Sequence, residues 1–160
     1  MAERERVGIA SAKSLSVKGN VTIGGTLNVG GASQVTGGPL KVAKVALAAA
    51  DTAGGLFAWQ NPEASSIIVV RTLLDVTTKS TGACTVDVGT TATNATTSSD
   101  NLLDGVDVGT AAGLFGSINE AGTNGKSRQK LAAGKWVTGS KATGATAGIV
   151  GSAYIEYFLA

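Results

Sequence analysis

Residues 66–76 read SIIVVRTLLDV and form the strongest apolar run of the chain. β-branched residues open the run, and they favour a strand over a helix. A second segment, Ile149–Leu159, alternates between two faces: Ala153, Ile155, Tyr157 and Leu159 on one, and Tyr154, Glu156 and Phe158 on the other. Alternation with a period of two is typical of a β-strand. The two segments together predict an all-β body.

Six further runs separated by turn residues complete this pattern. They are Val42–Leu47, Leu56–Trp59, Cys84–Val88, Val106–Val108, Leu114–Ile118 and Trp136–Thr138. Eight short strands with turn signals about every 8–15 residues favour an eight-stranded jelly-roll-like β-sandwich, which we place at residues 39–160. Helical composition is confined to Ala46–Ala50 and Ala132–Lys135, so we expect at most one helical turn at each. The near-duplicates VDVGTTA (86–92) and VDVGTAA (106–112) suggest two equivalent strand exits that are neighbours in the sheets.

Before Gly37-Gly38-Pro39, residues 13–36 divide into four hexads: KSLSVK, GNVTIG, GTLNVG and GASQVT. Seven of the eight third and fifth positions are apolar: Leu15, Val17, Val21, Ile23, Leu27, Val29 and Val35. Two apolar side chains per hexad cannot close a core within one thin chain, so repeats of this kind stack or find partners. We therefore predict an intertwined β-stalk at residues 13–38 whose apolar stripe is the interface of a homotrimer. Two ordinary hairpins packed on the body are the alternative.

Residues 1–12 are too short to fold alone. They contain the charge cluster Glu3-Arg4-Glu5-Arg6 and then Val7 and Ile9. Such a segment is either a frayed terminus or an arm that becomes ordered on a partner. In the second interpretation the candidate binding residues are Arg4, Arg6, Val7, Ile9 and Lys13.

The composition excludes several classes of protein. The 160 residues include no His and one Cys, which excludes Ser-His-Asp and Cys-His catalysis, intrachain disulfides and His- or Cys-cluster metal sites. We therefore predict no enzyme activity, no cofactor and no metal. No run approaches the ~18 apolar residues of a membrane span, and no run of like charges indicates nucleic-acid binding.

Charge is nevertheless segregated along the chain. Residues 1–44 carry six basic and two acidic side chains, residues 45–125 two basic and eight acidic, and residues 126–160 five basic and one acidic. A basic N-terminal segment favours an acidic protein surface, and ordinary solvated faces are the alternative.

Three further groups of residues are candidates for metal binding, reactivity or ligand binding. Asp100, Asp104 and Asp107 are the densest acidic group, but their spacing does not match a calcium loop, so capped turns are expected. Cys84 lies in an alternating strand and is predicted to be a buried small hydrophobe. Trp59 and Trp136 are predicted to anchor the core rather than to form binding platforms.

The combination of these segments resembles the head-fibre and capsid-decoration (cement) proteins of tailed bacteriophages. The segments that carry the resemblance are GNVTIGGTLNVGG (19–31) and, over most of residues 40–160, FAWQNPE (57–63), SIIVVRTLLDVTT (66–78), the VDVGT strands and AYIEYF (153–158). The resemblance implies a homotrimer on the outside of an icosahedral capsid, bound to the major capsid protein, with the N-terminal part nearer the shell. None of these strings is a catalytic motif, and no functional residue can be transferred individually.

Sequence and resemblance together suggest a structural virion protein, made in the host bacterial cytoplasm, whose arm binds the outer capsid surface and whose stalk trimerises. Two alternatives were weighed. A tail-fibre or adhesin-like tip that binds a host receptor or glycan would share the stalk and the sandwich, but calls for an exposed aromatic platform or an acidic loop cluster. A jelly-roll enzyme of the cupin type requires His ligands, which the chain lacks.

Overall fold

The computed structural model describes residues 40–48, 55–94 and 99–160, which all belong to the unit Val35–Ala160. The predicted arm (1–12), the predicted stalk (13–38) and the boundary at residues 37–39 lie outside the described residues. The part of the chain that is described contains nine strands and no helix. The strands are β1 (Lys41–Ala46), β2 (Phe57–Gln60), β3 (Ile67–Thr78), β4 (Cys84–Thr91), β5 (Leu103–Asp107), β6 (Gly113–Gly116), β7 (Gln129–Leu131), β8 (Trp136–Gly144) and β9 (Val150–Leu159).

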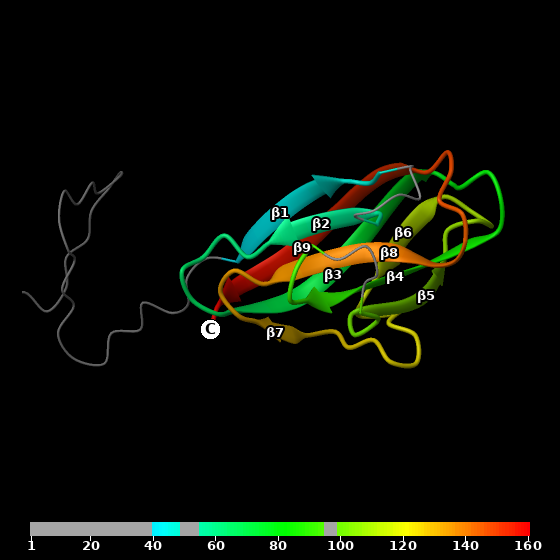
Figure 1. The fold of residues 1–160 in the computed structure, drawn as a ribbon. Coiled ribbons are helices and arrows are strands. Elements are labelled where there is room, and N and C mark those ends of the chain that lie inside the picture. Colours follow the sequence, from blue (N-terminus) through cyan, green and yellow to red (C-terminus); the bar gives the residue numbers. More distant parts are fainter. Residues whose placement is uncertain (1–39, 49–54, 95–98) are drawn as a thin grey trace, which may run out of the picture. The chain divides into compact units, whose positions relative to one another are not determined.

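These strands form the two layers of a sandwich (Figure 1). The first sheet has the order β1-β9-β3-β6, with β7 also paired to β3, and the second sheet has the order β2-β8-β4-β5. Every pairing is antiparallel. The chain passes repeatedly between the two sheets, and the first and last strands of the described residues, β1 and β9, are neighbours. This is the arrangement of a jelly roll.

The predicted all-β, jelly-roll-like fold is thus confirmed for the body. Each of the eight predicted strands overlaps an observed one. The ninth, β7, was missed because its sequence, QKL, has no apolar alternation. The segment predicted at Leu114–Ile118 ends as a strand at Gly116, and no helical turn forms at Ala132–Lys135.

A β-bulge explains how the 12-residue strand β3 buries both of its halves. The register to β9 shifts between Val69 and Arg71. Ile67 and Val69 are buried before the shift, and Thr72, Leu74 and Val76 are buried after it. Because alternate residues face opposite sides of a strand, one extra residue is needed to turn both sets inward.

The core lies between the two sheets and is built mostly from aliphatic side chains. The largest fully buried ones include Leu56, Ile67, Leu74, Leu102, Leu103, Leu131, Ile149 and Ile155. The two VDVGT strands do meet here as neighbours, with Val86 opposite Val106. They are not equivalent exits, however, because β4 continues to Thr91 whereas β5 ends at Asp107.

Candidate interaction surface

The outer faces of the two sheets differ in character. Seven large hydrophobic side chains are exposed among the described residues: Leu40, Val42, Leu114, Ile118, Val150, Phe158 and Leu159. All seven lie on strands of the first sheet or within two residues of one, and none lies on the second sheet. Contiguous exposed apolar surface is uncommon on monomeric proteins and marks interaction sites. The first sheet is therefore where the body has a candidate interaction surface.

Strand register identifies the residues of this surface, because directly opposed residues of an antiparallel pair share a face. Opposite β9, Val42 faces Glu156, Lys44 faces Tyr154, and Leu73 also faces Tyr154. Asp75 lies opposite Leu114 on β6, and Ile68 lies opposite Phe158. We name this set the β9 face: Val42, Lys44, Ile68, Arg71, Leu73, Asp75, Leu114, Tyr154, Glu156 and Phe158, together with Ile118 just beyond β6.

Three of the charged side chains of the β9 face make contacts within it. Arg71 Nη2 donates to Glu156 Oε1 across β3 and β9, and both side chains are partly buried. Lys44 Nζ lies 5.5 Å from the centre of the Tyr154 ring, at cation–π distance. Beside Arg71 the β9 face contains a hollow of about 280 Å³, whose lining includes Leu73, Leu114 and Ile118.

The outer face of the second sheet is dominated by hydroxyl groups instead. Thr85 and Thr143 are opposed on β4 and β8, with their hydroxyl oxygens 2.7 Å apart. Thr91 and the buried Thr138 are diagonal neighbours in the same pair of strands, with their hydroxyl oxygens 3.3 Å apart. Asp87 lies opposite Ser140 in the same ladder. These cross-strand pairs provide hydrogen-bond partners for hydroxyl groups within the sheet itself.

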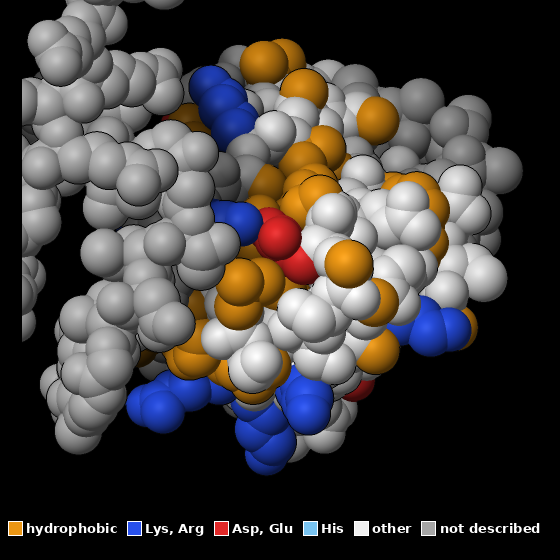
Figure 2. Space-filling view, turned by 90° about the vertical axis from the view of Figure 1, so that its left-hand side faces the viewer, with side chains coloured by type: hydrophobic (Ala, Val, Ile, Leu, Met, Phe, Trp, Pro, Cys, Tyr) orange, Lys and Arg blue, Asp and Glu red, His pale blue; other side chains and the backbone are white. Residues whose placement is uncertain are grey.

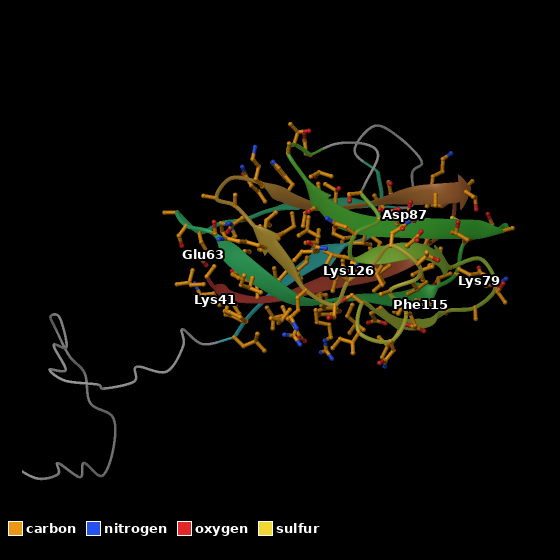
Figure 3. The ribbon with its side chains drawn as sticks, turned by 90° about the horizontal axis from the view of Figure 1, so that it is seen from below. Lys41, Glu63, Lys79, Asp87, Phe115 and Lys126 are labelled. Carbon is orange, nitrogen blue, oxygen red and sulfur yellow. The ribbon has the colours of Figure 1, made fainter. Side chains whose placement is uncertain are left out.

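A second group of side chains closes the end of the body where β1 begins. Lys41 Nζ donates to Glu63 Oε1 at 2.6 Å, and Tyr157 Oη donates to the same oxygen at 3.3 Å. The rings of Trp59 and Tyr157 are 5.1 Å apart and tilted by 49°. Figure 3 shows Lys41 and Glu63 together at this end, with Lys79 at the other. On the end of the body where β9 finishes, hydrophobic side chains reach the surface among lysines and arginines (Figure 2).

The Lys41–Glu63 ion pair makes stability depend on pH at both extremes. The hydrogen bond from Lys41 lowers the pKa of Glu63 below the usual 4.5. The stabilisation from the pair is therefore present above pH 4.5 and is lost as the pH falls through the lowered pKa. The same bond raises the pKa of Lys41 above 10.5, so the stabilisation is also lost as the pH rises beyond that value. Burial is the main cause that raises the pKa of Tyr157, which adds to the loss of stability above pH 10.0.

We expect Glu63→Gln to flatten the acid side of the stability curve. Because the variant has no carboxylate to protonate, its melting temperature should fall less than that of the wild type between about pH 5 and pH 3. Thermal melts followed by circular dichroism across this range measure the difference. Equal slopes for the two proteins would contradict the assigned role of the ion pair. Glu120→Gln is the matched control at an exposed carboxylate outside this cluster.

Each of the three acidic residues singled out in the sequence accepts hydrogen bonds, Asp107 from its own loop and the other two from Asn124. Asp107 Oδ1 accepts from Gly109 N at 2.8 Å and Thr110 N at 3.0 Å, and Asp107 Oδ2 accepts from Thr110 Oγ1 at 2.6 Å. These bonds hold the pKa of Asp107 below its usual range, with the Thr110 hydroxyl as the largest cause. Asn124 binds the other two carboxylates, through its N–H to Asp104 Oδ2 and through its side-chain amide to Asp100 Oδ2. The expected capped turn is confirmed for Asp107, whereas Asp100 and Asp104 bind a segment distant in sequence.

Burial raises the pKa of Asp87, and the carboxylates of Asp104 and Asp100 raise it further, against a hydrogen bond from Gly105 N. These carboxylates form a cluster of like charges, but they are not arranged as the ligands of a metal ion. Among the described residues, no three His, Cys, Asp or Glu side chains are grouped so that they could hold a metal ion. No helix in residues 40–48, 55–94 and 99–160 could span a membrane.

Two of the three single-residue predictions for the body are confirmed. Cys84 is buried in the core, with 2% of its surface exposed. Trp59 packs against the core and the Tyr157 ring. The prediction for Trp136 is wrong: it lies opposite Thr91 and Gln60 on the outward side of the second sheet, half-buried and outside the core cluster. Alternation places it there, because the next residue, Val137, points inward and is fully buried.

The predicted binding residues lie outside the described part of the chain. This holds for the arm residues Arg4, Arg6, Val7, Ile9 and Lys13 and for the stalk stripe from Leu15 to Val35, so those assignments stay predictions. Sequence reasoning missed the β9 face. Tyr154 and Phe158 were visible as the second face of an alternating strand, but Val42, Leu73 and Leu114 join them only through the sheet order.

Comparison with known proteins identifies a similar fold and no sequence family. No protein-family model matches the chain, and no curated protein matches it. Among solved structures, a chain of the capsid of Ralstonia phage GP4 is similar, with a TM-score of 0.53 and 23% sequence identity. The match covers 80% of this chain and 89% of that one. The likeness therefore extends over most of each chain.

Proposed function

We propose that this chain is a structural virion protein that binds the outer surface of a phage capsid as a homotrimer and stabilises the shell. The observation that carries the proposal is the fold it shares with a chain from the capsid of Ralstonia phage GP4, over 80% of this chain and 89% of the other. Fold alone does not determine function. The surface chemistry of the body and the pattern of the N-terminal sequence supply the rest of the argument.

The surface chemistry of the body favours contact over reaction. The chain has no His and its one Cys is buried. The carboxylates of Asp107 and Glu120 accept hydrogen bonds from their own loops, and that of Asp104 accepts one from Asn124. The first sheet instead exposes aliphatic and aromatic side chains, which are typical of protein interfaces. These features support attachment to other proteins as the function.

The N-terminal sequence supplies the means of attachment in this proposal. The apolar stripe of the hexads joins three chains, and the three arms, through Arg4, Arg6, Val7, Ile9 and Lys13, bind the major capsid protein together. Once one arm of the trimer has bound, the other two are held at high effective concentration near their sites. Three arms that each bind weakly therefore give the trimer a high affinity for the shell. A trimer that binds only the assembled shell stabilises that shell by linkage.

Binding to bare capsids tests the function directly. Capsids of the parent phage, assembled without this protein, would be mixed with the purified full chain and sedimented. We expect saturable co-sedimentation at a fixed stoichiometry per particle and a raised disruption temperature of the shell. A protein that ignores bare capsids but binds host cells or a glycan array would overturn the proposal in favour of a receptor-binding tip.

A stalk substitution tests the trimer. In this proposal Ile23→Asp places three carboxylates in an apolar stripe, where charges lose their hydration without gaining partners. We expect the trimer dissociation constant to rise at least about tenfold, which corresponds to ~1.4 kcal/mol. Sedimentation equilibrium measures it, and Thr22→Asp, at the neighbouring position between the apolar ones, is the matched control. An Ile23→Asp trimer as stable as the wild type would contradict the buried stripe.

A further inference from the structure

We propose that the β9 face packs against a second copy of this chain, so that the bodies of the oligomer contact one another in addition to any contact at the N-terminus. The inference rests on the proposed homotrimer and names a second interface within it. It begins from the distribution of exposed hydrophobic side chains, all seven of which belong to the first sheet or its immediate flanks. Leu114 is the most exposed of them, at 63%.

The composition of the β9 face matches that of a protein interface. Tyr154 and Phe158 provide aromatic surface and Arg71 a guanidinium group, the kinds of residue that are enriched at interfaces and hot spots. Leu73, Leu114 and Ile118 surround a hollow of about 280 Å³ that could receive side chains of a partner. The strands of the second sheet carry none of the exposed large hydrophobic side chains, so exposure of these groups is specific to one sheet of the sandwich.

The charges of the face favour a copy of the same chain over a strongly charged partner. With Lys130, which lies opposite Ile68 on β7, and Glu120, which lines the hollow, the face carries three cations and three carboxylates. It therefore has no net sign with which to attract an acidic or basic surface. Arg71 and Glu156 are already bound to each other, and Lys44 lies over Tyr154. A surface that is neutral overall can approach its own copy without the cost of placing a net charge of one sign against the same sign.

The position of the chain entry also favours a second copy. Thirty-nine residues precede Leu40, and they lead directly into β1, an edge strand of the first sheet. Leu40 and Val42, at 55% and 57% exposure, continue the apolar surface to this entry. Copies joined through the preceding segment would meet at millimolar effective concentration, at which even a modest apolar face associates.

Thiol labelling of the full chain tests this interface independently of capsids. Leu114→Cys places a thiol on the β9 face, and Thr143→Cys places one at an exposed position of the second sheet. The parent chain, whose Cys84 is buried, gives the background. We expect a bulky maleimide to label the thiol at position 114 at least tenfold more slowly than the thiol at 143 in the oligomer, and equally fast after dilution to monomers.

The outcomes separate this inference from the proposed function. An oligomer in which both thiols react at the same rate overturns the β9-face contact but leaves capsid binding standing. Slow labelling at position 114 in a protein that does not bind capsids supports the contact and overturns the capsid role. A chain that is monomeric at all concentrations overturns both the contact and the homotrimer.

Discussion

Removing residues 1–12 is expected to lower the affinity of the trimer for bare capsids at least about a hundredfold, while the body stays folded and trimeric. In our proposal the arm supplies the contacts to the shell, and three arms act together. Multivalent attachment of this kind raises binding by ~10²–10⁴ over a single contact, and deletion of the arm removes the contact that is multiplied. Quantitative co-sedimentation with a concentration series measures the loss.

The composition of the arm provides a milder variant and a control. Arg4→Glu with Arg6→Glu reverses two charges but keeps Val7 and Ile9, so binding should weaken most at low salt, where exposed charges are least screened. Lys141→Glu, an exposed change on β8, is the matched control and should bind as the wild type. A truncated chain that decorates capsids with unchanged affinity would show that the arm is not the anchor.

Gly144→Ala is expected to be the most damaging small substitution in the body. Gly144 has a φ of +72°, and a Cβ atom there would lie 1.9 Å from the carbonyl oxygen of Ala83. The backbone conformation alone costs an alanine ~1–2 kcal/mol, and forcing atoms into a packed site typically adds ~1–3 kcal/mol. The total is a large share of the ~5–15 kcal/mol by which most domains are stable.

A neighbouring glycine makes the control for this prediction. A Cβ atom at Gly82 would meet nothing within 4 Å, and Gly82 has no positive φ, so Gly82→Ala should leave stability within about 1 kcal/mol. Thermal unfolding followed by circular dichroism should show Gly144→Ala melting about 10 °C or more below the wild type. Equal melting temperatures for the two variants would contradict the close approach of β4 and β8 at this point.

The all-β fold was predictable because a strand with one buried face has an apolar residue at every second position of its sequence. In β9, Ala153, Ile155 and Tyr157 are buried as their spacing indicates. The bulge of β3 was not predictable, because the same run of apolar letters fits a continuous register until the pairing with β9 is known. β7 was missed for the opposite reason: three residues, QKL, pair with β3 without any apolar pattern.

The residues of the candidate surface could not be grouped from the sequence, because strand pairing alone brings them together. Leu73 and Leu114 are 41 positions apart in the sequence and meet on one face only because β6 pairs with β3. Lys41 and Glu63, 22 residues apart, are likewise joined by the fold and not by any motif. Asp107, by contrast, binds residues within three positions of itself, and this local turn was predicted from its neighbours.

Imaging of particles that contain this protein tests the central claim most directly. Electron cryomicroscopy of the parent phage, with antibody or gold labelling of the chain, would locate it on the virion. The account predicts three-fold studs distributed over the capsid shell, absent from particles made without the protein and restored by adding the purified chain. Density confined to the tail tip, or labelling of the tail fibres alone, would contradict it.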